Sequence, residues 1–90
     1  MYDISVGDVV KATAGRDKDK FFLVIEVSDG FAFIVDGKTR KVGKPKRKNV
    51  KHLIKAAAAS MQNDADKIQR GEPFGNRRLK KCIADAIQKK

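Results

Sequence analysis

The stretch from Val6 to Val27 constrains the fold most, because it predicts two strands joined by a short polar turn. Three valines between positions 6 and 10 supply the apolar residues of the first strand, and the run 21–25 supplies those of the second. Gly15 stands between them and can adopt a positive φ, as a chain reversal often requires. Five consecutive charged residues follow at 16–20, and burying charge is costly, so we expect a solvated loop there.

Two further apolar runs predict how this hairpin continues. Residues 21–27 are almost continuously apolar and end at a Ser-Asp-Gly turn signal. The run 31–35 follows so closely that we expect it to pair antiparallel with the second strand. Three short strands at this spacing predict a small closed or half-closed β-barrel.

The next segment is expected to complete the barrel. We expect residues 43–48 to form a loop, because Pro45 has no amide hydrogen for a central ladder and the neighbouring lysines repel one another. The alternating segment 50–54 predicts another strand, although neither of its faces is clearly apolar. The barrel unit is therefore assigned to residues 1–56.

Residues 57–90 have a different pattern and are assigned to a helical appendage of one or two short helices. Asn63 and the acidic residues after it resemble a helix start, and the glycine and proline at 71 and 73 would end that helix. Asn76 is a candidate cap for a second helix. That helix carries one apolar stripe, formed by Leu79, Cys82, Ile83, Ala86 and Ile87.

The positive charge is concentrated in one block. The chain has 90 residues and a net charge of +10, and residues 38–55 hold nine basic residues and no acidic ones, whereas residues 1–37 carry a net charge of −3. Such charge runs often serve only solubility. A block with no compensating carboxylate favours an anionic partner, since lysine and arginine bind phosphates by releasing counterions.

Several other functions find no support in the residues. No apolar stretch approaches a bilayer span, the first residues do not resemble a signal peptide, and the single cysteine fits a reducing, cytoplasmic environment. His52 and Cys82 do not make a metal-ligand set, and the Gly-Lys-Thr at 37–39 lacks the upstream glycine and following helix of a phosphate-binding loop. We therefore expect no enzyme activity, no cofactor, no metal, no membrane association and no small-molecule substrate.

The segment 6–53 resembles the KOW group that contains the fourteenth large-subunit ribosomal protein family of archaea and eukaryotes and its small bacterial relatives. The likeness rests on V-G-D-V-V at its start, Gly15 in the turn, V-I-E-V, V-D-G with Arg40 soon after, K-P-K-R-K and K-H-L. Asn76-Arg77 is similar to the pair that introduces the tail helix of the short bacterial members. The resemblance implies a five-stranded SH3-like barrel that binds RNA, in ribosomal members ribosomal RNA.

We therefore expect an RNA-binding protein of translation, with ribosomal RNA and the large ribosomal subunit as partners. The residues predicted to contact RNA are Arg16, Lys18, Lys38, Arg40, Lys41, Lys44, Lys46, Arg47, Lys48 and Lys51. The four phenylalanines of the strands, at 21, 22, 31 and 33, are expected mainly in the core, with stacking on bases as the alternative. A different class stays open: a protein-interaction KOW module, as in transcription elongation or ribosome-associated regulation.

Overall fold

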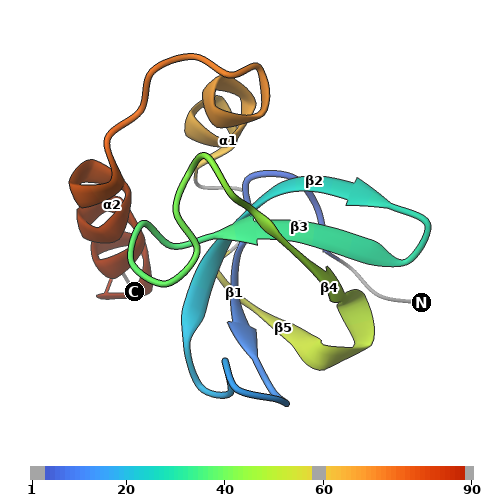
Figure 1. Ribbon diagram of the computed structural model, residues 1–90. Coiled ribbons are helices and arrows are strands. Elements are labelled where there is room, and N and C mark those ends of the chain that lie inside the picture. Colours follow the sequence, from blue (N-terminus) through green and yellow to red (C-terminus); the bar gives the residue numbers. More distant parts are fainter. Residues whose placement is uncertain (1–3, 58–60, 89–90) are drawn as a thin grey trace.

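Five strands and two helices follow one another along the chain in the computed structural model, which describes residues 4–57 and 61–88 (Figure 1). The strands are β1 (Val9–Ala12), β2 (Phe21–Ser28), β3 (Phe31–Val35), β4 (Lys46–Asn49) and β5 (Leu53–Ala57). A short 3₁₀ turn, η1 (Val50–His52), joins β4 to β5. The helices are α1 (Gln62–Gln69) and α2 (Asn76–Gln88).

The strands form one antiparallel sheet in the order β4-β3-β2-β1-β5. The sheet curls, and η1 connects its two edge strands (Figure 1). Among the described residues no ladder joins β4 to β5, so the sheet is curved but not closed. The prediction of a mostly β, five-stranded fold with one or two C-terminal helices is confirmed at this level, and the structure has two helices.

The sheet buries both of its faces, and alternating side chains of β2 show how. Phe22 and Val24 point to the inner face, which the curl encloses, whereas Leu23 and Ile25 point to the outer face. The inner core consists of Val10, Ala12, Phe22, Val24, Ala32, Ile34, Val50 and Leu53. A strand buried on both faces reads as a continuous apolar run, which is why β2 was predicted so clearly.

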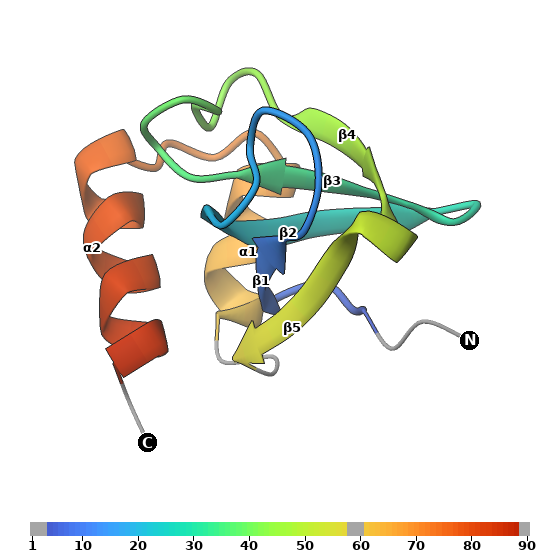
Figure 2. The same ribbon diagram turned by 90° about the horizontal axis from the view of Figure 1, so that it is seen from below.

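The two helices cover the outer face of the sheet (Figure 2). Leu79 and Ile83 of the predicted α2 stripe are buried against the sheet, and the other three stripe residues are partly buried beside them. Helix α1 adds Ala65 and Ile68 to the same core. It begins at Gln62 with Met61 as its N-cap, so Asn63, the expected cap, lies inside the helix. Amphipathic helices this short depend on such packing for their stability.

Three local predictions were wrong. Residues 46–49 form strand β4 rather than a loop, because an edge strand pairs on one side only and accepts lysines, and Pro45 falls just before it. Residues 50–52 form η1 rather than a strand, with the Asn49 side chain accepting from the Lys51 amide at 3.0 Å. Strand β1 begins at Val9, since the preceding Gly7 turns the chain with φ +93°.

Candidate nucleic-acid interface

The loop between β1 and β2 lies against the segment that contains β4. The Nζ of Lys48 on β4 donates a hydrogen bond to the carbonyl oxygen of Ala14 at 3.0 Å. Gly15 follows with φ +79°, as predicted for the turn. Folding therefore brings the charged turn and the basic block together, although 34 positions separate the bonded residues.

A buried ion pair also links this loop to the loop between β3 and β4. The Asp17 side chain is only 5% exposed and its Oδ2 lies 3.2 Å from Nη2 of Arg40. The expectation that all of residues 16–20 would be solvated was wrong at Asp17, because a guanidinium compensates the buried carboxylate. Arg40 therefore holds two loops together through its Nη2, while its Nε is buried without a hydrogen-bond partner among the described residues.

The other carboxylates near these loops are engaged as well. Asp36 accepts hydrogen bonds from the amides of Lys38 and Arg40, both at 2.8 Å, and from the Thr39 hydroxyl at 2.9 Å. Asp19 forms an ion pair with Lys11 at 3.7 Å. The acidic groups of this region thus serve internal contacts, and most of its lysines remain on the surface.

The ten predicted RNA contacts differ in exposure and in position, and Arg47 is the exposed one on β4. Arg16 and Lys18 are exposed on the β1–β2 loop, Lys51 is exposed on η1, and Arg40, Lys46 and Lys48 are half-buried. Three exposed lysines, at 38, 41 and 44, lie on the loop between β3 and β4. The two loops are neighbours through the contacts above, and both are visible in Figure 2 beside β4.

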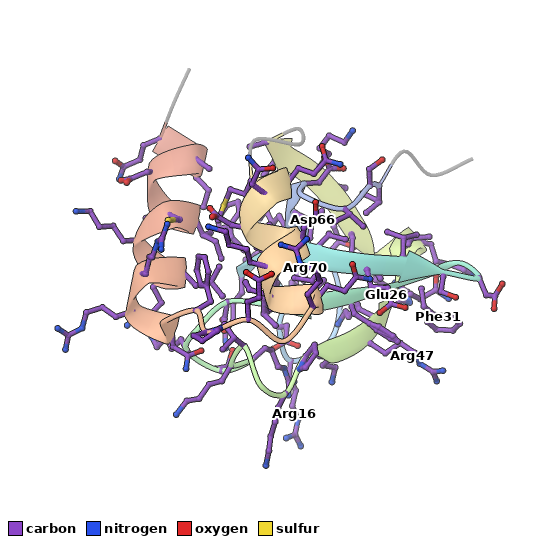
Figure 3. The ribbon with its side chains drawn as sticks, turned by 90° about the horizontal axis from the view of Figure 1, so that it is seen from above. Arg16, Glu26, Phe31, Arg47, Asp66 and Arg70 are labelled. Carbon is purple, nitrogen blue, oxygen red and sulfur yellow. The ribbon has the colours of Figure 1, made fainter. Side chains whose placement is uncertain are left out.

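The three cations of β4 lie on both faces of the sheet, because successive side chains of a strand point to opposite faces. Lys46 and Lys48 stand opposite Ile34 and Ala32 of the inner face, whereas Arg47 stands opposite Phe33 of the outer face. The guanidinium carbon of Arg47 lies 4.5 Å from the centre of the Phe31 ring, and Figure 3 shows the two side by side. Arg47 is therefore separated from the lysines on either side of it.

The exposed cations of the β1–β2 loop, the β3–β4 loop and β4 form a basic surface. Helix α2 extends this surface with residues that were not among the predicted contacts. The Oδ1 of Asn76 accepts a hydrogen bond from the Val42 amide at 2.9 Å, which ties the start of α2 to the β3–β4 loop. Exposed basic residues then follow on the helix, namely Arg77, Arg78, Lys80 and Lys81. Their signal in the sequence is a run of four cations within five positions.

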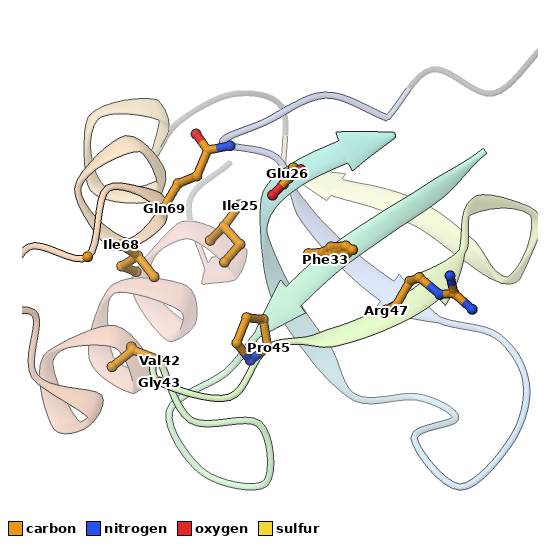
Figure 4. A pocket seen from close by; sticks show the side chains of 10 residues that line it. Ile25, Glu26, Phe33, Val42, Gly43, Pro45, Arg47, Ile68 and Gln69 are labelled. Carbon is orange, nitrogen blue, oxygen red and sulfur yellow. The ribbon is translucent and has the colours of Figure 1, made fainter. Parts of the chain in front are cut away.

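A groove of about 600 Å³ opens on the outer face beside this surface (Figure 4). Its lining comes from β2, β3, the segment 42–47 and the end of α1, so no local sequence pattern indicated it. Nearby, a hydrogen bond and charge attraction to Glu72 raise the pKa of the Arg70 guanidinium above its ordinary value. Glu72 is thereby engaged like the carboxylates of the loops.

The function has to be argued from these features. No protein-family model matches the chain, and no curated protein matches its sequence. In the described ranges, 4–57 and 61–88, no three His, Cys, Asp or Glu residues gather in a way that would hold a metal ion. None of the helices there has the length and apolar character needed to cross a bilayer. The distinctive feature is the basic surface and the groove beside it.

Proposed function

We propose that this chain is an RNA-binding module of the KOW type, in which an SH3-like barrel presents cations to the phosphate backbone. The observation that carries the proposal is the basic surface, whose exposed lysines and arginines come from two adjoining loops, β4 and the start of α2. The carboxylates among them are engaged in internal contacts. An anionic polymer would relieve the repulsion among the remaining charges.

Phosphate contact is the chemistry that suits these side chains. Lysine and arginine neutralise backbone charge, and the counterions released from RNA supply affinity with little dependence on base sequence. The exposed loop lysines keep their Nζ groups in solvent, so they are able to meet phosphates without breaking the fold. Arg40 has a different role in this proposal, since it positions the two loops through Asp17.

We further propose ribosomal RNA as the partner and the large ribosomal subunit as the assembly, in support of translation. The sequence resemblance to the fourteenth large-subunit ribosomal protein family supports this choice. The competing class, a KOW module that docks on proteins, would use apolar anchors and would respond little to salt.

One matched pair of variants tests the phosphate contacts. Lys44→Ser removes an exposed charge from the β3–β4 loop, and Lys67→Ser removes an exposed charge from α1. In fluorescence anisotropy with a structured ribosomal RNA fragment at about 0.1 M salt, we expect Lys44→Ser to lower affinity several-fold, because one phosphate contact is worth roughly a factor of eight there. Lys67→Ser should bind like the parent. Equal affinities for all three proteins would remove the loop from the interface.

A second experiment tests the choice of RNA. The native protein should sediment with large ribosomal subunits in a sucrose gradient at low salt and be released at high salt. Small subunits in the same gradient serve as the control. A protein that binds RNA in solution but stays at the top of the gradient would refute the ribosomal partner and leave RNA binding intact.

A further inference from the structure

Three side chains of different chemistry stand in one row across the outer face of the sheet. Glu26 on β2 is the register partner of Phe33 on β3, and Phe33 is the register partner of Arg47 on β4. Directly opposed residues on adjacent strands have Cβ atoms about 5 Å apart. A carboxylate, an aromatic ring and a guanidinium-bearing side chain therefore lie abreast, as Figure 4 shows, and all three line the groove.

The rest of the groove is lined mainly by apolar side chains and glycines. A register shift between Val24 and Glu26 brings Ile25 into the lining together with its neighbour. Apolar walls come from Ile25, Val42, Pro45 and Ile68, while Gly43 and Gly71 add no side chain. A volume of about 600 Å³ lies within the range of pockets that bind small molecules.

The Glu26 side chain has no ion pair or side-chain hydrogen bond with any residue that the structure describes. The guanidinium of Arg47, two strands away, lies over Phe31 instead. An ionised carboxylate accepts hydrogen bonds and donates none, so its natural partner is a group with N–H donors. Gln69 across the groove has an amide that both donates and accepts.

We propose that the groove holds one unpaired guanine of the bound RNA. The inference rests on the proposed function, since the base would enter as part of a strand held by the basic surface. Guanine alone among the four RNA bases presents two adjacent N–H donors, N1–H and the 2-amino group, which match the two oxygens of Glu26. Phe33 supplies aromatic surface for the base, as single-stranded RNA readers commonly do.

The charges around the groove favour a nucleotide over an apolar peptide. Arg47 stands at its rim and Lys44 lies between two lining residues, so a base in the groove would have cations beside its flanking phosphates. A peptide of apolar side chains would leave the Glu26 carboxylate without a partner. A base bound in the groove would add a preference for one base to a surface that otherwise contacts only phosphates.

The test uses labelled hexauridylate and two versions of it with a single central guanosine or inosine. Inosine lacks the 2-amino group and keeps the rest of the guanine edge. For the parent protein we expect the guanosine oligomer to bind about tenfold more tightly than hexauridylate, the lower part of what one paired contact discriminates. Inosine should lose most of that gain.

The variant Glu26→Gln should abolish the preference and leave affinity for hexauridylate nearly unchanged. Asp85→Asn removes the same charge from an exposed position on α2 and should keep the preference. Equal binding of guanosine and inosine by the parent, or a preference that survives Glu26→Gln, would overturn the inference. If all three oligomers bind alike, only the groove assignment fails, whereas absence of binding to any RNA refutes the proposed function as well.

Discussion

Gly37 is the position at which one added methyl group should disturb the interface most. It is buried with φ +79° in the β3–β4 loop, and a Cβ atom there would collide with the carbonyl oxygen of Asn76 at the start of α2. The obstacle is backbone, so either the loop or the helix has to move. Gly30 offers a matched control, because its φ is +81° and nothing lies within 4 Å of the position of its Cβ.

Both alanine variants carry the cost of a positive φ, and only Gly37→Ala also carries the cost of overpacking. The left-handed conformation costs a non-glycine residue about 1–2 kcal/mol, which the reduced entropy of the unfolded chain partly offsets by about 0.4–1 kcal/mol. Gly30→Ala should therefore lower the unfolding free energy by about 1 kcal/mol. Gly37→Ala adds an overpacking cost of about 1–3 kcal/mol, for a total of about 2–4 kcal/mol.

Urea unfolding followed by circular dichroism measures the difference between the two variants. Gly37→Ala should also lower the melting temperature well below that of Gly30→Ala, since each kcal/mol shifts it by about 4–8 °C in a domain of this size. Equal destabilisation of the two variants would refute the close approach of α2 to the loop. The basic surface would then consist of the loops and β4 without the helix.

Two more substitutions test the interactions that hold this surface together. Asp17→Asn should lower the unfolding free energy by roughly 1–3 kcal/mol, because it weakens the buried bond to Arg40, and an unchanged urea midpoint would contradict that pairing. Leu79→Ala should cost about 2–5 kcal/mol, since Leu79 is fully buried between α2 and the sheet. Rapid amide exchange throughout 76–88 in the parent would show instead that α2 does not pack there.

The strands that could be predicted from the sequence are those whose own residues determine them. β2 and β3 are apolar and β-branched or aromatic along most of their length, and both lie where the pattern placed them. β4 has no apolar residue, so nothing local indicated a strand. It is extended because its backbone pairs with β3, which is an interaction outside its own segment.

The candidate site likewise has features that could be predicted from the sequence and features that could not. The basic block was visible in the composition, and so was the turn at Gly15. The burial of Asp17 depends on Arg40, which lies 23 positions further along the chain, and the groove depends on four separate segments. Such arrangements arise from tertiary packing, and no single stretch of sequence carries their signal. RNA binding, the KOW resemblance and the ten contact residues stay predictions.

The salt dependence of RNA binding tests the central claim most directly. Lys38, Lys41 and Lys44 are exposed on one loop, so their joint replacement by serine should leave folding nearly unchanged. For the parent, the logarithm of the association constant should fall linearly with the logarithm of salt concentration. The triple variant should reduce that slope by roughly 2–3, or about 0.7–0.9 for each phosphate that the protein no longer neutralises. A folded triple variant with the parent's slope and affinity, or a parent whose affinity does not change with salt, would contradict the account.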